Sequence, residues 1–561
     1  MQTQVGSNLR RTVFAALWFL PILVALYLVW RHCVSLPFWD EWQTPGAQLA
    51  SWYRGTFAWG DLWSQHNESR KLFPRLVYLP LFLVAGWDVR LTIALVLIVV
   101  CLGSLGLYCL ARQTIRGARA ASLAFAVINL LLFSPRQYDN FLFGIQWETF
   151  APGVALIFAM LINLSKLSFH RKTIWNGALA LVSTYTFANG MLLWLLAFPL
   201  NTGSDAPASS RSKMGWRLIY VGAAIASIGC YFINYQHPAF SPPRASLLKD
   251  ATPLFHFFCI WIGSVFRIAN PALAGAVVLG LFLFLAALSI WLTANDRRWQ
   301  PHYPWMVLGA YTLISGAATA IARVGFGFTM AADPRYVVFS VMLYIAIVGL
   351  GFTIYEKIWD RGNLRRAGQF FGAIAVLVIL ALWASTFTAE RGSLKKFTEY
   401  RTHLQWVLRW ADAVPRNPEL VWLSPYPETP QVIQTLHEHG ALRPRRVSDT
   451  VTRAVTESPG AGNASTGVLE QAVADGSGRL WVKGWALAAD CVVIGLRTSG
   501  RWEPRWVVET SARSPANNRV TFSRPLLIGD ISGNALRIKA WAIDLKTDRA
   551  FPLAGEIALQ P

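Results

Sequence analysis

The stretch RLTIALVLIVVCLGSLGLYCLA at residues 90–111 contains no charged side chain after Arg90. A helix of about 20 apolar residues crosses a hydrocarbon core of about 30 Å, so this run predicts a membrane-spanning helix. Similar runs recur along the first two thirds of the 561 residues and stop near residue 388. With 54% hydrophobic and 14% charged residues, the chain has too little polar surface for a soluble globule of this size. The sequence therefore predicts a polytopic α-helical membrane protein.

Eleven apolar runs are predicted to cross the membrane. They are residues 13–30, 90–111, 120–134, 150–168, 174–188, 190–200, 217–235, 271–293, 304–322, 335–355 and 369–388. We place a tight external turn at Asn189-Gly190, because one long helix there would invert the charge pattern of the loops. With this count the N-terminus is cytoplasmic, and everything after residue 388 is periplasmic in a bacterial inner membrane.

The basic residues support this topology. Every predicted inner connection is basic, as the positive-inside rule requires. These residues are Arg112, Arg116 and Arg119, then Arg171 and Lys172, then Arg211, Lys213 and Arg217, then Arg297 and Arg298, and finally Lys357, Arg361, Arg365 and Arg366. The net charge of +21 is therefore explained by membrane topology, and a nucleic-acid partner is not expected. The six cysteines lack the spacing of a zinc site or a disulfide framework.

Three segments follow along the chain. Residues 1–388 form a transmembrane module with outer loops 31–89, 135–150, 236–270 and 323–334. Within these loops the stretches 44–58, 72–87 and 253–267 are too short or too amphipathic to span, which favours helices at the outer interface. Residues 389–464 begin with an amphipathic helix over 389–414 and continue as a Pro-rich linker. From about residue 465 the runs GRLWVKGWAL, CVVIGLRT, WEPRWVVET, RVTFSRPLLI and ALRIKAWAIDL predict a small antiparallel β-sandwich.

The first outer loop begins with an acidic pair, Asp40 and Glu41, between Trp39 and Trp42. An acid just beyond the membrane could act as a general base toward an acceptor hydroxyl, or hold a divalent cation such as Mg or Mn against a phosphate leaving group. The neighbouring indoles suit the faces of sugar rings. Alternatively, these are solvated acids beside interfacial tryptophans.

The same loop carries further polar residues on the outer side. They are His66, Asn67, Glu68, Arg70, Lys71 and Arg75. The positive-inside rule does not place cations on this side, whereas binding of a donor phosphate or sugar would. The alternatives are contact with anionic lipid head groups, and a structural role for His66.

Two more outer loops hold candidate binding residues. The second loop, RQYDNFLFGIQWETF at 136–150, interleaves aromatic residues with Gln137, Asp139, Asn140, Gln146 and Glu148. Such mixtures can read sugar hydroxyls, and packing against the first loop is the competing explanation. The turn RVGFGFTMAADPRY carries Arg323 and Arg335 at helix ends, where a lipid phosphate could bind. Snorkelling of helix-end arginines is the alternative there.

An acidic pair shortly after the first span, in a long outer loop with interfacial helices, resembles the GT-C superfamily of polyprenyl-phosphate-sugar-dependent glycosyltransferases. The layout is similar to that of lipid A aminoarabinose transferase and the protein O-mannosyltransferases. The motifs PFWDEW, HNES at 66–69, DNFLFGIQ at 139–146, TFANG at 186–190 and DPRY at 333–336 are similar to those of uncharacterised bacterial membrane proteins of this superfamily. Those relatives more often have HNEHR, so Ser69 replaces a second histidine here.

This resemblance covers roughly residues 10–390 and implies catalytic roles for Asp40 and Glu41. It implies a sugar linked to a polyprenyl phosphate as donor, inverting transfer without a nucleotide sugar, and a glycan, lipid or protein acceptor. Membrane lipids are the other expected partner. A transporter or flippase, a polymerase or ligase of lipid-linked saccharides, and an assembly scaffold remain the rival functions. Tryptophans of the C-terminal domain could bind an acceptor glycan or pack in its core; they are Trp481, Trp485, Trp502, Trp506 and Trp541.

Overall fold

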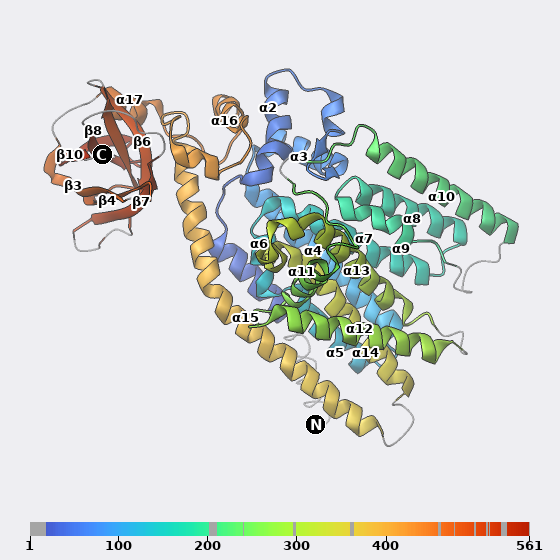
Figure 1. Cartoon of the computed structure of the whole chain (residues 1–561). Coiled ribbons are helices and arrows are strands. Elements are labelled where there is room, and N and C mark those ends of the chain that lie inside the picture. Colours follow the sequence, from blue (N-terminus) through green and yellow to red (C-terminus); the bar gives the residue numbers. More distant parts are fainter. Residues whose placement is uncertain are drawn as a thin grey trace, which may run out of the picture. The chain divides into compact units, whose positions relative to one another are not determined.

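The computed structural model contains two compact units, each assembled from separate stretches of chain (Figure 1). It describes residues 18–200, 210–238, 241–294, 299–358, 364–457, 462–475, 477–498, 501–511, 514, 517–528 and 536–559. The first unit comprises Met1–Cys33, Trp59–Val77 and Arg90–Lys395, and the second comprises Val34–Ala58, Tyr78–Val89 and Lys396–Pro561. The first outer loop is thus divided between the two units, and its acidic pair belongs to the second.

Long apolar helices dominate the first unit. Their bounds are α4 (Val89–Thr114), α5 (Ala118–Leu132), α7 (Trp147–Leu164), α10 (Ser210–Phe232), α12 (Pro271–Thr293), α13 (Tyr303–Arg323), α14 (Val337–Ile358) and α15 (Leu364–Arg409), with the shorter α8 (Phe169–Thr184) between α7 and α10 in the chain. The residues of α15 after Lys395 belong to the second unit. Together with the short helical turns that adjoin some of them, eight stretches of the described chain are long and apolar enough to cross a membrane. They coincide with eight of the eleven predicted crossings.

The other three predicted crossings are shorter in the structure. The first is described as the helix Trp18–His32, and the fifth is the 16-residue helix α8. The sixth contains only a 3₁₀ turn, Ala188–Leu192, and the four-residue helix α9 (Leu193–Leu196). The helix is interrupted at the predicted Asn189-Gly190, since α8 ends at Thr184 and these residues lie in the 3₁₀ turn. Gly190 fits there because a Cβ atom would lie 1.9 Å from the carbonyl oxygen of Ser183. Of the predicted inner cations, Arg297, Arg298 and Arg361 lie outside the described residues.

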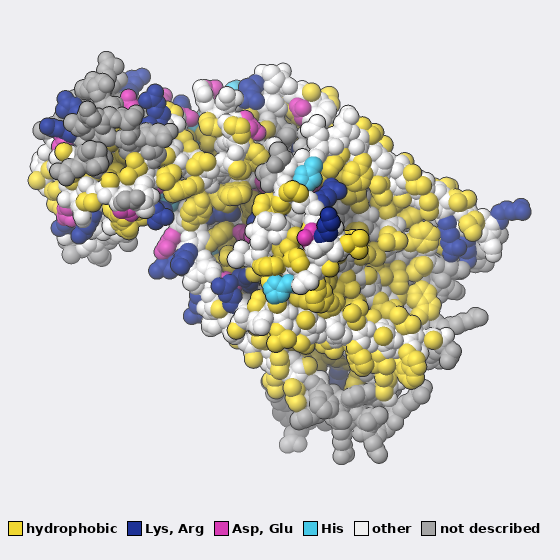
Figure 2. Space-filling view, viewed as in Figure 1, with side chains coloured by type: hydrophobic (Ala, Val, Ile, Leu, Met, Phe, Trp, Pro, Cys, Tyr) yellow, Lys and Arg dark blue, Asp and Glu magenta, His cyan; other side chains and the backbone are white. Residues whose placement is uncertain are grey.

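Apolar side chains cover much of the surface of this unit (Figure 2). Only 17% of the most apolar stretch of α10 is buried, and the same holds for α12. Leu218 and Ile225 of α10 and Phe284 of α12 are among the large apolar side chains left exposed. Apolar surface of this extent is what a hydrocarbon solvent would cover.

Two clusters of contacts define opposite ends of these helices. At one end the carboxylate of Glu356, near the end of α14, accepts hydrogen bonds from the backbone N–H groups of Arg116 and Gly117, between α4 and α5. Both bonds measure 2.9 Å. The loop after α5 and the turn before α14 are at the other ends of their helices, and they also contact each other through Asn140 and Pro334. We call this second end the polar end, because the predicted outer loops meet there.

The short helices and α15 match the predictions from sequence. Helices α2 (Ala47–Tyr53), α3 (Leu72–Ala85) and α11 (Ala251–Gly263) occupy the stretches predicted to be too short to span. Helix α15 joins the last predicted crossing and the predicted amphipathic helix in one helix of 46 residues. The stretch predicted as a linker instead contains a 3₁₀ turn (Pro418–Trp422) and helices α16 (Thr429–Glu438) and α17 (Asp449–Glu457).

The chain ends in a β-rich domain of the second unit. Its strands are β3 (Asn463–Asp475), β4 (Arg479–Leu487), β5 (Cys491–Thr498), β6 (Arg501–Glu509), β7 (Arg519–Leu527), β8 (Leu536–Asp544), β9 (Arg549–Ala554) and β10 (Ile557–Leu559). The strand order is β6-β5-β8-β9-β3-β4-β7, with β10 on β8, and the β3–β9 pair is parallel. The two end strands approach each other, since the Trp506 indole N–H donates to the carbonyl of Leu527 at 2.7 Å. One nearly closed sheet therefore replaces the predicted two-sheet antiparallel sandwich.

Candidate functional site

The acidic pair of the first outer loop lies in a 3₁₀ turn, Trp39–Glu41, of the second unit. Its two carboxylates have different surroundings. Glu41 is buried, and its Oε2 accepts the backbone N–H of Phe38 at 2.9 Å, which closes the turn. Asp40 is half-buried, and its Oδ1 accepts the hydroxyl of Tyr426 at 2.8 Å. Asp40 is therefore the member of the pair that a substrate hydroxyl could reach, and Glu41 supports the turn.

The tryptophans on either side of the pair also differ. Trp39 is 46% exposed and has a backbone φ of 50°, a conformation that side chains rarely adopt outside special turns. Trp42 is 1% exposed and packs edge-on against Trp87, with ring centroids 5.1 Å apart. Only the Trp39 indole is thus placed to meet a sugar ring at the surface.

The donor set at Asp40 and Glu41 is a poor fit for a cation held mainly by protein ligands. Within the described chain, no group of three or more His, Cys, Asp or Glu side chains is arranged to hold a metal ion. Mg²⁺ takes six ligands in octahedral geometry, and Glu41 is already occupied by a backbone N–H. This pair therefore lacks the ligand set of a cation that is held mainly by protein side chains.

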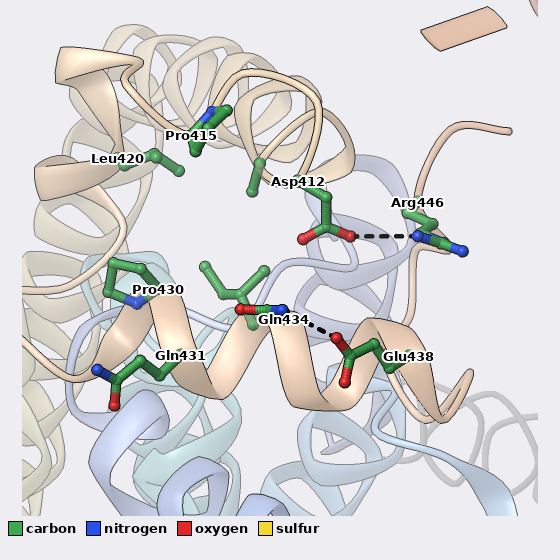
Figure 3. Close-up of a pocket in the computed structure, with 10 residues that line it drawn as sticks. Asp412, Pro415, Leu420, Pro430, Gln431, Gln434, Glu438 and Arg446 are labelled. Carbon is green, nitrogen blue, oxygen red and sulfur yellow. Dashed lines mark hydrogen bonds and ion pairs between the residues drawn. The ribbon is translucent and has the colours of Figure 1, made fainter. Parts of the chain in front are cut away.

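The second unit also contains a cavity of about 340 Å³ between the turn after α15 and helix α16 (Figure 3). Asp412 projects into it beside Arg446, with 3.8 Å between Oδ2 and Nη1, and Gln434 bonds Glu438 across one turn of α16 at 2.9 Å. The same Asp412 oxygen lies 2.9 Å from Nδ1 of the buried His437. Arg446 and the residues of α16 lie in the stretch that was predicted to be a linker, whereas Asp412 lies in the predicted amphipathic helix 389–414, and the sequence did not predict that these polar groups meet.

A β-hairpin at the polar end of the first unit presents Glu68. Strands β1 (Gln65–His66) and β2 (Ser69–Arg70) pair around a turn in which Asn67 has a φ of 49°, a conformation that asparagine tolerates well. The Glu68 Oε1 accepts Arg323 Nη2 at 2.5 Å and the Ser241 hydroxyl at 3.2 Å. Three segments remote in sequence therefore converge on one half-exposed carboxylate.

Burial near this hairpin changes the acidity of its neighbours. The pKa of Tyr235 is raised, chiefly by burial and secondarily by the negative charge of Glu68. The pKa of Arg75 is lowered to about 10, because burial disfavours its charged form, while Glu148 and Asp61 oppose the shift. Both groups remain in their ordinary charge states at neutral pH.

The other polar residues of the first loop are taken up by the protein itself. The Arg70 guanidinium donates to the carbonyls of Tyr231, Ile233 and Trp63, and Lys71 pairs with Glu148 at 2.7 Å. Arg75 donates to the carbonyls of Leu62 and Ser64, and His66 is buried in the hairpin. The structure gives these predicted phosphate ligands internal partners and leaves Arg323 as the cation nearest to Glu68.

Arg335 is the most accessible arginine of the predicted set at the polar end. Its Nε and Nη2 donate to Oδ2 of Asp333 at 3.0 and 2.8 Å, and the other Asp333 oxygen caps the start of the turn that leads into α14. Asn140 of the second loop donates to the carbonyl of Pro334 at 3.3 Å. The structure thus brings the predicted residues Asn140 and Arg335 to the same place.

The second loop is mostly buried. Asn140 and Gln146 are buried, and Gln146 accepts the Thr149 hydroxyl at 2.9 Å, whereas Asp139 is half-buried. Next to them lies an ion pair that the sequence did not predict, with 2.5 Å between Arg136 Nη1 and Glu390 Oε1 of α15. Among the predicted acceptor-binding residues of this loop, Asp139 therefore has the most accessible side chain.

The predicted site residues therefore form two groups. Asp40, Glu41, Trp39 and Trp42 belong to the second unit, and the hairpin, the second loop, Arg323 and Arg335 belong to the first. Searches against protein-family models, curated proteins and solved structures return no match to this chain.

Proposed function

We propose that this chain is an inverting glycosyltransferase of the bacterial inner membrane, with a GT-C-like arrangement of helices. It moves a sugar from a polyprenyl phosphate to an envelope glycan, lipid or protein on the periplasmic side. The observation that carries the proposal is the contact of Glu68 with Ser241 and Arg323, from three remote segments, at the end of the apolar helices where the turn that carries Arg335 also lies. A membrane-embedded donor presents its phosphate at that level.

The arginines at the polar end suit a phosphate leaving group. Arg335 is 40% exposed at its side chain and lies beside the start of α14, where the helix dipole adds positive potential. Its guanidinium can exchange part of its contact with Asp333 for two phosphate oxygens in a bidentate arrangement. Arg323 is likewise paired with a carboxylate, that of Glu68, and its side chain is less exposed than that of Arg335. Two cations, each stabilised by a carboxylate, would compensate the charge that develops on the departing phosphate.

Asp40 has the properties of the base. In the proposed step the acceptor hydroxyl oxygen bonds to C1 of the sugar, and the bond from C1 to the phosphate oxygen breaks. The hydroxyl proton passes to Asp40, and the electron pair leaves on the polyprenyl phosphate. The hydrogen bond from Tyr426 orients the Asp40 carboxylate, and the exposed Trp39 gives the acceptor sugar a surface to stack on.

Transport or flipping of lipid-linked saccharides is the rival function. Transporters usually place ionisable groups or broken helices near the middle of the membrane. In the apolar helices that the structure describes, the ion pairs instead lie at the polar end, as with Arg323 at the last residue of α13. A polymerase of lipid-linked saccharides would share the donor, and it would be distinguished by a product that grows by repeated units.

The test is transfer of radiolabelled sugar by the purified chain in lipid nanodiscs. Undecaprenyl-phosphate-linked glucose, mannose, galactose and 4-amino-4-deoxyarabinose serve as donors, with envelope extract as acceptor and with or without Mg²⁺ and Mn²⁺. We expect label to leave one of these donors and Asp40→Asn to reduce that transfer at least about 100-fold, because a positioned base contributes about 10²–10⁴.

The matched control is Asp61→Asn, which neutralises another carboxylate of the same outer loop. We expect its transfer rate to stay within about threefold of the rate of the parent chain. A threefold change corresponds to about 0.6 kcal/mol in the activation free energy. Equal transfer by Asp40→Asn and the parent chain would overturn the assignment of the base. Movement of an intact labelled donor across a sealed bilayer, with no transfer of label, would favour the flippase.

A further inference from the structure

The nearly closed sheet has an outer face formed by β3, β4 and β7 that carries two of the tryptophans. Side chains alternate along β4, so Leu480, Val482 and Ala486 enter the core. Trp481, Lys483 and Trp485 consequently point outward on the same face. Trp506 and Trp541 are fully buried, which rules them out as surface contacts for a glycan.

Trp481 forms an open aromatic platform on this face. Its side chain is 46% exposed, and its indole N–H donates to Oδ2 of Asp475 at 3.3 Å, which fixes the orientation of the ring. In the paired strands it lies between Val473 and Pro525, so the row around it is apolar. Asp475 also accepts from Ser477 and from the backbone N–H of Arg479, and these bonds lower its pKa. It therefore stays ionised and keeps the indole in place.

Next to Trp481, on the same face of the sheet, lies a row of side chains that can form hydrogen bonds. Lys483 lies between Gln471 of β3 and Ser523 of β7 in the register of the sheet. It is exposed, and within the described chain no carboxylate lies within ion-pair distance of it. An outward ammonium beside an amide and a hydroxyl could bind both a carboxylate and neutral hydroxyl groups.

The third row ends the platform with a second cation. The Arg519 guanidinium lies over the ring of Trp485, 4.1 Å from its centroid, and its side chain is 41% exposed. Glu470 approaches it only to 3.8 Å, which leaves donors of this stacked guanidinium to the solvent. Trp485 follows Trp481 four positions later in the strand, which corresponds to about 13 Å at about 3.3 Å per residue. That length accommodates more than one sugar ring.

From these three rows we infer that the face of β3, β4 and β7 binds a polysaccharide that carries carboxylates, with a sugar ring stacked on Trp481 and acidic groups against Lys483 and Arg519. An indole presents its electron-rich face to the slightly positive C–H groups of a pyranose ring. The two outward cations give the face charge complementarity to uronic acids. This inference does not rest on the transferase activity.

The test is binding of soluble polysaccharides to the full chain, held in nanodiscs of neutral phosphatidylcholine and immobilised for biolayer interferometry. Oligosaccharides of alginate, polygalacturonate and hyaluronan are the acidic probes, and dextran, laminarin and cellohexaose are the neutral probes. We expect at least one acidic probe to bind more tightly than every neutral one. Trp481→Ala should weaken that binding at least tenfold, and Lys483→Gln should reduce the preference for acidic probes.

The control variant is Arg537→Ala, which removes an exposed cation of the same domain on β8, paired with Glu556 at 3.1 Å. It should bind the acidic probe like the parent chain, and all variants should show the thermal midpoint of the parent chain. Undiminished binding by Trp481→Ala would overturn the inference, as would failure of every probe to bind. The proposed chemistry of the ligand would be overturned if neutral and acidic probes bound equally well and Lys483→Gln changed neither affinity.

Discussion

Two regions at the polar end of the first unit use the same residue types in different surroundings. Around the second loop, Glu148 pairs with Lys71 of the first loop and Arg136 pairs with Glu390 of α15, and these side chains are at most 6% exposed. Around the hairpin and the turn before α14, Arg323 pairs with Glu68 and Arg335 with Asp333, and these side chains are 19–40% exposed. The first region has few routes for a ligand, and the second is open to one.

This difference in exposure distinguishes ion pairs that stabilise the fold from ion pairs that could bind a ligand. A charge buried with one partner cannot lose that partner without a large penalty, so Arg136 and Lys71 hold loops and helices together. A half-exposed pair is worth little to stability, because water and salt already screen it. Such a pair can exchange its carboxylate for a phosphate at low cost. The comparison therefore predicts stability effects in one region and activity effects in the other.

The largest effect is expected where the buried pair is broken. Glu390→Gln removes the negative charge opposite the buried Arg136 guanidinium, whose neutral partners would then be the new amide oxygen and the carbonyl of Ala332. We expect the free energy of unfolding to fall by about 3–5 kcal/mol, the usual cost of removing one partner of a buried ion pair. Thermal unfolding of the chain in nanodiscs would show this as a lower midpoint.

A double variant distinguishes lost charge from lost packing. Arg136→Met combined with Glu390→Leu removes both charges and keeps most of the volume, and such replacements are often neutral or stabilising. We expect its midpoint to return close to that of the parent chain. A double variant as unstable as Glu390→Gln would show that hydrogen bonds to the loop, and not the unpaired charge, account for the loss.

A smaller effect, on activity instead of stability, is expected at Arg335. If the proposed function is correct, Arg335→Ala should lower transfer by about 100-fold, which is typical of removing one donor to a developing negative charge. The midpoint of unfolding should change little, because this ion pair is half-exposed. Arg335→Lys keeps the charge but loses the bidentate geometry, so transfer should be intermediate. Full activity with alanine would remove Arg335 from the site.

Much of the fold could be predicted because its signals are local. Apolar length and flanking cations located the eight long apolar stretches among the eleven crossings that were predicted, and alternation indicated five strands, including β5 at Cys491–Thr498. The sequence indicated only about where β3 begins and not the strand itself, because Gly467 and a bulge after Leu469 interrupt the alternation of its side chains. Helix α16 was read as linker because of its prolines, although Pro430 occupies the first turn, where a missing N–H costs nothing.

The candidate site was less predictable because its contacts are long-range. The bond from Tyr426 to Asp40 joins residues 386 positions apart, and the pair of Arg136 with Glu390 joins residues 254 positions apart. No pattern within a loop reveals such partners. Residue type also did not separate Trp39 from Trp42, or Arg70 from Arg335, since only burial shows which side chain faces outward.

The smallest effect is expected at Glu68. Glu68→Gln keeps an oxygen that can accept from Arg323 and Ser241 but removes the charge, so the free energy of unfolding should fall by at most about 1 kcal/mol. That loss should shrink further between 0.05 and 0.5 M salt, whereas the loss in Glu390→Gln should not, since a buried pair is screened much less. If Glu68→Gln proved as costly as Glu390→Gln, exposure would not be what separates the two regions. Arg323 would then belong with the supporting pairs, and the proposed phosphate contact would rest on Arg335 alone.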